Sequence, residues 1–157
     1  MKSELPDAEI PGRKPLGKQC IKPGPTTAKR VFIVEDHPVL RETLVQMVGR
    51  EENLTVCGEA GEAREAFEAI AHLKPDLVMV DISLPDKDGL ELVEALRAAD
   101  RKIKLLVHSM HDAALYGDRA LAAGANGYVR KQGDPQELIH AIQVVLDGRS
   151  YVSNDTR

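Results

Sequence analysis

The stretch that decides the fold is LVMVDISLPDKDGL, residues 77–90. Its first four residues are apolar, and Asp81 follows them directly. A run this short and this apolar predicts a strand that is buried on both faces of a parallel sheet. A carboxylate at the exit of such a strand is costly to bury unless another group pairs with it. The stretch therefore predicts a central strand that delivers Asp81 to a site with a cation or a polar partner.

The composition is typical of one globular domain without a membrane segment. The chain has 157 residues, of which 43% are hydrophobic and 29% charged, so it can bury a core of its own. Its apolar runs are too short for a transmembrane helix or a signal peptide. Cys20 and Cys57 lie far apart and lack the spacing of metal ligands. These features predict a cytoplasmic protein without a membrane partner.

Charge and proline are unevenly distributed along the chain. Residues 1–30 hold seven Lys/Arg and three Asp/Glu, a charge of +4 in a chain whose net charge is −4, so the remainder carries −8. We expect residues 1–28 to be a disordered, basic, proline-rich arm, residues 29–150 the folded domain and residues 151–157 a short tail. The acidic body argues against nucleic acid as the main partner, and we expect no direct DNA binding by this chain.

After Arg30, segments with strand character alternate with segments of helical periodicity. The predicted strands are residues 31–34, 54–57, 76–80, 103–109 and 126–129. The predicted helices are residues 37–50, 62–73, 88–99, 112–124 and 134–148. Asp134 and Glu137 have the residue types and spacing of a capping box at the start of the last helix. This alternation predicts an α/β fold, a doubly wound five-stranded parallel sheet with helices on both faces.

Polar residues at the exits of these strands predict the functional site. Ligands of such sheets bind beyond the carboxyl ends of the strands. The residues found there are Glu35 and Asp36 after the first strand, Asp81 after the third, Ser109 after the fourth, and Tyr128 to Lys131 at the fifth. We therefore expect three carboxylates, a hydroxyl and an ammonium to converge on one rim of the sheet.

Such a rim is suited to phosphoryl transfer. Neighbouring carboxylates raise one another's pKa values unless a cation lies among them. Carboxylate oxygens are ligands for Mg²⁺ or Mn²⁺, and Mg²⁺ commonly completes its shell with water and phosphate. A metal beside Asp81 would screen its charge and present a phosphoryl group for in-line attack by the carboxylate. Lys131 could then balance the charge of the acyl phosphate, and Ser109 could donate to another phosphoryl oxygen.

Four motifs, in their order along the chain, resemble the receiver domain of bacterial two-component response regulators. They are VFIVEDHP (31–38), LVMVDISLPDKDGL (77–90), VHSM (107–110) and GYVRK (127–131). The DHP at 36–38 and the segment GANGYVRKQGDPQELIHAI (124–142) resemble the subfamily that usually carries a C-terminal LuxR-type helix-turn-helix. The resemblance covers residues 29–150 and implies a flavodoxin-like receiver fold with strand order 2-1-3-4-5.

The resemblance also implies roles for the acidic side of the rim. Asp81 corresponds to the phosphoacceptor, and Glu35 and Asp36 correspond to the acidic pair that binds Mg²⁺. The backbone carbonyl of Ser83 corresponds to a further metal ligand. Glu35 replaces the aspartate that is commoner in this pair, a substitution that the family tolerates.

On the other side of the rim, Ser109 corresponds to the switch hydroxyl, Tyr128 to the switch aromatic and Lys131 to the phosphate-contacting lysine. Gln132 follows Lys131 where many receivers have proline, which leaves the isomer of that peptide bond open. Receivers take phosphate from a sensor histidine kinase or a phosphotransfer protein. They then change the face formed by the fourth helix, fifth strand and fifth helix, which binds a downstream protein or a second copy. They are phosphoacceptors, not enzymes in the ordinary sense.

Several alternatives stay open at this point. Toprim nucleases and primases also place a glutamate after the first strand, but their third strand ends in DxD, whereas this chain has Asp81-Ile82-Ser83. A degenerate receiver would bind partners without phosphorylation, and the set of rim residues argues against it. The output is equally open, because the chain could be a stand-alone receiver or the receiver half of a truncated DNA-binding transcriptional regulator.

Overall fold

Six parallel strands and five helices alternate along the chain in the computed structural model, which describes residues 28–153. The strands are β2 (Lys29–Val34), β3 (Leu54–Ala60), β4 (Leu77–Val80), β5 (Lys104–Ser109), β6 (Gly127–Arg130) and β7 (Tyr151–Val152). The helices are α2 (Pro38–Gly49), α3 (Ala63–Leu73), α4 (Gly89–Ala99), α5 (Ala113–Ala123) and α6 (Pro135–Leu146).

The order of the strands in the sheet is β3-β2-β4-β5-β6-β7. With β2 counted as the first strand, the predicted order 2-1-3-4-5 is confirmed, and each neighbouring pair is parallel. Between consecutive parallel strands the chain crosses over through a helix, as such pairing requires. The carboxyl ends of β2, β4, β5 and β6 therefore meet at one rim.

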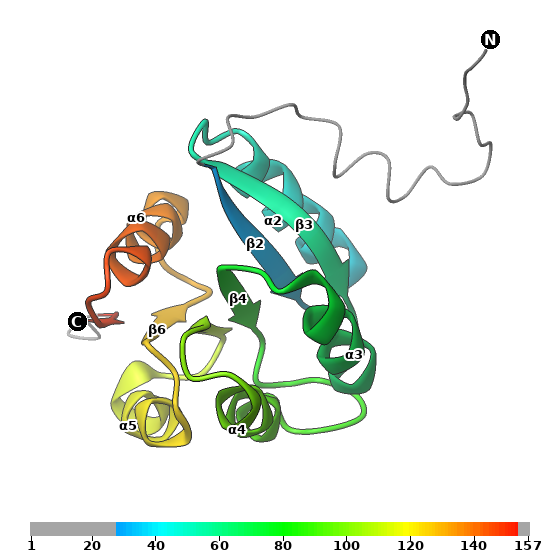
Figure 1. Ribbon diagram of the computed structural model, residues 1–157. Helices are drawn as coiled ribbons and strands as arrows, with labels where there is room; N and C mark the ends of the chain where they lie inside the picture. The colour runs from blue at the N-terminus through cyan, green and yellow to red at the C-terminus, as the bar shows by residue number, and fades with distance from the viewer. Residues whose placement is uncertain (1–27, 154–157) are drawn as a thin grey trace, which may run out of the picture.

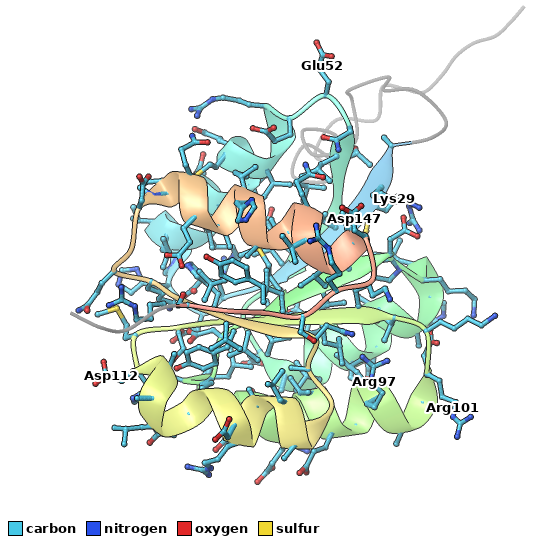
Figure 2. The ribbon with its side chains drawn as sticks, turned by 90° about the vertical axis from the view of Figure 1, so that its left-hand side faces the viewer. Lys29, Glu52, Arg97, Arg101, Asp112 and Asp147 are labelled. Carbon is cyan, nitrogen blue, oxygen red and sulfur yellow. The ribbon has the colours of Figure 1, made fainter. Side chains whose placement is uncertain are left out.

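Two layers of helices enclose the sheet. Figures 1 and 2 show α2 and α6 on one face and α3, α4 and α5 on the other. All four residues of β4 are buried: Val78 and Val80 pack in the core under α3, α4 and α5, and Leu77 and Met79 pack under α2 and α6. This confirms the strand buried on both faces. The described helices have 11 or 12 residues, and none of these is long and apolar enough to cross a membrane.

The sixth strand, β7, was not predicted, and it lies in residues that we assigned to the C-terminal tail. Ser153 N–H donates to the carbonyl of Tyr128 at 2.9 Å, and Ser153 Oγ accepts from Arg130 N–H at 3.0 Å. Two residues are too few for a periodic pattern to reveal a strand. The proposed bounds of the folded domain, 29–150, stay a prediction, and the expected arm lies almost wholly outside the described residues.

Of the two residues predicted to form a capping box at the start of α6, Asp134 caps the helix and Glu137 does not. Asp134 caps the helix as predicted, since its Oδ1 accepts from Gln136 N–H at 2.9 Å. Glu137 instead turns to the C-terminal segment, where Oε2 accepts from Tyr151 Oη at 2.8 Å and from Ser153 Oγ at 2.9 Å. Two hydroxyl donors thus replace the backbone N–H that a capping box would offer to Glu137.

The second predicted strand continues three residues beyond its expected end at Cys57. The register between β2 and β3 shifts there, so that Val31 faces Val56 and Phe32 faces Gly58. A Cβ at position 58 would lie 2.8 Å from the Phe32 ring. Glycine therefore marks a bulge with close packing and not the end of the strand.

Candidate functional site

Three carboxylates gather at the carboxyl ends of β2 and β4. Oxygen atoms of Glu35, Asp36 and Asp81 all lie within 4.8 Å of one another. Glu35 and Asp81 are buried, with exposed fractions of 1% and 3%, whereas Asp36 is exposed. The sequence placed these residues on one rim, and the structure brings them together as predicted.

Lys131 reaches this acidic cluster from the end of β6. Its Nζ lies 2.9 Å from Glu35 Oε1 and 3.2 Å from Asp81 Oδ2. The Lys131 N–H donates to the carbonyl of Ser109 at 2.7 Å, so β5 fixes the backbone that carries the ammonium. Residues 28–153 contain no cis peptide bond, and the Lys131–Gln132 bond is therefore trans.

Burial and neighbouring charges perturb the titration of this cluster. Burial raises the pKa of Glu35, the contact with Lys131 opposes the rise, and the charge of Asp81 adds to it. For Lys131, burial would lower the pKa, but the contact with Glu35 and the charge of Asp81 outweigh it and the pKa is raised. The ammonium is thus held charged, while the glutamate gains from any further cation placed beside it.

The acidic cluster fits a hard divalent cation. Glu35 Oε1 is buried, and among the described residues no donor makes a well-directed hydrogen bond to it, although Lys131 lies at ion-pair distance. Asp36 supplies a carboxylate open to solvent, from which a cation can enter with part of its hydration shell. Ser83 N–H donates to Asp81 Oδ1 at 3.2 Å and leaves Oδ2 on the side of Lys131. Oxygen donors of this kind suit Mg²⁺ or Mn²⁺.

Ser109 ends β5, the strand next to β4, Tyr128 lies in β6, and both side chains are fully buried. Ser109 Oγ accepts from the His111 N–H at 3.1 Å, and Tyr128 Oη donates to the His111 carbonyl at 2.6 Å. Within residues 28–153 no hydrogen bond joins Ser109 to Asp81. In Figure 2, Asp112, which follows the carboxyl end of β5 and precedes α5, lies at one end of the layers. Lys29 and Arg101 lie at the opposite end.

The loop after β4 is fixed by backbone contacts that need glycine. Asp88 caps α4, with Oδ1 accepting from Leu90 N–H at 2.8 Å. A Cβ on Gly89 would lie 2.0 Å from the carbonyl oxygen of Asp81. Only a residue without a side chain allows the start of α4 to approach Asp81 this closely.

Two residues that support the site were missed from the sequence. Asp86 accepts from Ala63 N–H at 2.8 Å and from Arg64 N–H at 3.0 Å, so it caps α3, and these hydrogen bonds lower its pKa. Arg41 donates to the carbonyl of Glu35 at 2.7 Å. No local sequence pattern predicts the contact of Asp86 with α3. Arg41 lies in the first turn of α2, shortly after the acidic pair, and this position could have indicated its contact with Glu35.

Comparisons with known proteins agree with this geometry. The family model for the response regulator receiver domain matches residues 31–143. The DNA-binding transcriptional activator DevR/DosR of Mycobacterium tuberculosis is 39% identical over 127 residues, 80% of this chain and 58% of that protein. The fimbriae Z protein of Salmonella typhimurium is 32% identical over 126 residues, 80% of this chain and 60% of that protein. The chain thus spans about three fifths of the length of these curated relatives.

A solved structure shows the same relationship. The two-component response regulator, LuxR family, from Aurantimonas sp. SI85-9A1 superposes with a TM-score of 0.79 at 36% identity, covering 82% of this chain and 91% of that chain. The predicted resemblance to LuxR-type regulators is therefore confirmed.

Proposed function

Because this chain belongs to the family of response regulator receiver domains, we propose that Asp81 is the phosphoacceptor of a phosphorelay. The family acts in two-component signalling as phosphoacceptors rather than as enzymes, which decides against the Toprim alternative. The donor in this proposal is a sensor histidine kinase or a phosphotransfer protein, and the reaction takes place in the cytoplasm, where such kinases obtain phosphate from ATP.

The observation that carries the proposal is the cluster of Glu35, Asp36 and Asp81, in which the Lys131 ammonium contacts Glu35 and Asp81. Two buried carboxylates with one lysine leave a net negative site, which is costly without a further cation. Glu35, Asp36, Asp81 and the backbone carbonyl of Ser83 would hold Mg²⁺ or Mn²⁺. When bound, the metal would screen the negative charges of the carboxylate and the phosphoryl group as they approach each other.

The residues of the chain have separate parts in the proposed transfer. An oxygen of Asp81 attacks the phosphorus, the P–N bond of the donor phosphohistidine breaks, and the imidazole nitrogen leaves with the electron pair of that bond. Lys131 exchanges its contact with Asp81 Oδ2 for one with a phosphoryl oxygen. The Ser109 hydroxyl, whose oxygen already accepts from His111, still has its proton to donate to the phosphoryl group.

Phosphorylation then changes the surface of α5, β6 and α6, which carries the signal to a downstream protein or a second copy of the chain. Tyr128, with its contact to His111, is the proposed link between the site and this surface. A second candidate output is that of the receiver part of a DNA-binding regulator. This is favoured by the DNA-binding activator and the LuxR-family regulator among its relatives. Sequencing the locus beyond codon 157 tests this candidate.

Intact-mass spectrometry with acetyl phosphate tests the assignment of Asp81. We expect a gain of one phosphoryl group in the presence of Mg²⁺ or Mn²⁺, none with a chelator, and none in Asp81→Asn. Asp36→Ala should lose the reaction because it removes a metal ligand. Asp147→Asn, at an exposed residue near the opposite end of the layers (Figure 2), serves as the matched control and should react as wild type does. Equal phosphorylation of Asp81→Asn and wild type would exclude Asp81.

DNA retention tests the proposal that the chain itself does not bind DNA. Residues 31–157 carry −8, which opposes binding to a polyanion. We expect no sequence-specific retention at physiological salt. Specific retention that persists after removal of residues 1–28 would overturn this proposal.

A further inference from the structure

A guanidinium contacts the peptide that joins the two acidic residues after β2. Arg41 Nη1 donates to the carbonyl of Glu35 at 2.7 Å, and Arg41 Nε donates to Glu59 Oε1 at 3.1 Å. This carbonyl belongs to the peptide unit between Glu35 and Asp36. The contact therefore restrains the rotation that sets where the two carboxylates point.

The other side of the same residue is also restrained. The Glu35 N–H donates to the carbonyl of Ala60 at 3.0 Å, so both backbone groups of Glu35 are hydrogen-bonded. With its backbone fixed at both groups, Glu35 turns its carboxylate into the protein while Asp36 remains exposed. Three neighbouring carboxylates repel one another, and a loose peptide would let them separate when no cation is bound.

Gly61 leaves the space into which this guanidinium extends. A Cβ at position 61 would lie 2.9 Å from Arg41 Nη1, closer than such atoms approach, but 3.8 Å from the Glu35 carbonyl. An alanine there would displace the tip of Arg41 without removing its charge, and it would meet the acidic peptide only at an ordinary van der Waals distance of 3.8 Å. The chain thus offers a variant that separates the position of Arg41 from its charge.

We propose that Arg41 is a positioning residue that pre-forms the acidic pair for a divalent cation. The inference rests on the proposed function, because it assigns Arg41 to the same metal site. Its ion pair with Glu59 offsets much of its charge, so its main contribution is orientation. Removing a partner that orients metal ligands commonly weakens metal binding by about 10–100-fold. For Arg41→Gln we expect a loss of about tenfold, the lower end of that range.

Mn²⁺ titration of the full chain, followed by electron paramagnetic resonance, measures this loss directly. Arg41→Gln and Gly61→Ala should both weaken binding, the second less because Nη1 can shift. Arg41→Lys should lie between Arg41→Gln and wild type, since one ammonium cannot reproduce the two directed contacts of a guanidinium. Arg50→Gln removes an exposed arginine just after α2 and should bind as wild type does.

A second measurement needs no metal. In the metal-free Arg41→Gln protein, amide resonances of Glu35, Asp36 and His37 should shift, and those of β5 should stay in place, which separates local reorientation from unfolding. Wild-type Mn²⁺ affinity in Arg41→Gln, with binding lost in Asp36→Asn, would overturn the inference alone. Weak binding by wild type that Asp36→Asn leaves unchanged would instead overturn the proposed function.

Discussion

Ser109 and Tyr128 are joined through one residue, because the His111 N–H donates to Ser109 Oγ at 3.1 Å and the His111 carbonyl accepts from Tyr128 Oη at 2.6 Å. Both side chains are fully buried, so neither can move without changing the packing around it. His111 directly precedes Asp112, the N-cap of α5. A displacement of Ser109 toward a phosphoryl group would therefore be transmitted to the start of α5 through His111.

Ser109→Ala should uncouple phosphorylation from α5. The variant keeps Asp81, Asp36 and Lys131 and should still bind beryllofluoride, a phosphoryl mimic. It lacks the hydroxyl that would donate to the mimic while its oxygen accepts from the His111 N–H. We expect amide shifts in residues 111–123 of wild type on adding beryllofluoride and clearly smaller shifts in the variant. Identical shifts in both proteins would exclude the hydroxyl as the relay.

Tyr128→Phe tests the other contact of His111. Phenylalanine retains the buried ring but removes the hydrogen bond to the His111 carbonyl. We expect a loss of about 1 kcal/mol in the free energy of unfolding, the typical net value of one hydrogen bond. Urea unfolding measures it. Tyr116→Phe, on the partly exposed first turn of α5, is the control and should cost less.

Gly89→Ala should disrupt the site through the backbone. The added Cβ would lie 2.0 Å from the Asp81 carbonyl, and the neighbouring atoms belong to backbone that cannot turn aside. We expect a loss of about 1–3 kcal/mol in the free energy of unfolding, as for overpacked cores, together with slower phosphorylation. Gly49→Ala, whose Cβ has no neighbour within 4 Å, should be neutral or slightly stabilising. Urea unfolding and intact-mass kinetics measure both effects, and equal results for the two variants would refute the argument.

The sequence predicted the sheet and the acidic rim because both depend on local patterns. Four apolar residues before Asp81 predict a buried strand, and parallel topology then places its exit beside that of β2. The missed features depend on distant partners. Asp86 caps a helix that begins 23 residues earlier in the chain. Glu137 accepts from the Tyr151 hydroxyl, in a strand of only two residues, and does not complete the predicted capping box. Such contacts become predictable only when the packing of the elements is known.

His108 should make the protein sensitive to acid. Burial, followed by the charge of Lys131, lowers the pKa of His108 from 6.5 to about 3. Below pH 6.5 the unfolded chain therefore binds a proton that the folded protein does not bind. The stability that the neutral His108 contributes is fully present above the unfolded pKa of 6.5. It decreases as the pH falls below that value, by up to about 1.4 kcal/mol per pH unit for one proton.

Urea unfolding between pH 4 and 6.5 measures this dependence. His108→Leu should lose stability less steeply than wild type as the pH falls, because its unfolded chain gains one proton fewer. His72→Gln, at an exposed histidine on α3, should leave the slope unchanged. The same slope in wild type and His108→Leu would show that His108 is not kept neutral by folding.

Glu137→Gln should loosen β7 and lower the pKa of Tyr151. Burial, together with the hydrogen bond to Glu137 and its charge, raises the pKa of Tyr151 to about 12. Glutamine removes the charge but not the burial, so the pKa should fall toward 10 without reaching it. Between pH 10 and about 12 the unfolded chain ionises Tyr151, whereas the folded protein keeps it protonated. The stability that the raised pKa contributes is therefore fully present below pH 10 and is lost as the pH rises toward 12. The variant should lose less stability than wild type between pH 10 and 12.

NMR titration of ¹³C-labelled tyrosine measures the pKa of Tyr151 in both proteins. Amide hydrogen exchange of Ser153, which should accelerate in the variant, reports on β7. Glu91→Gln is the matched control, since Glu91 occupies the first turn of α4 and is exposed. A Tyr151 pKa that stays at about 12 in Glu137→Gln would show that burial alone sets it.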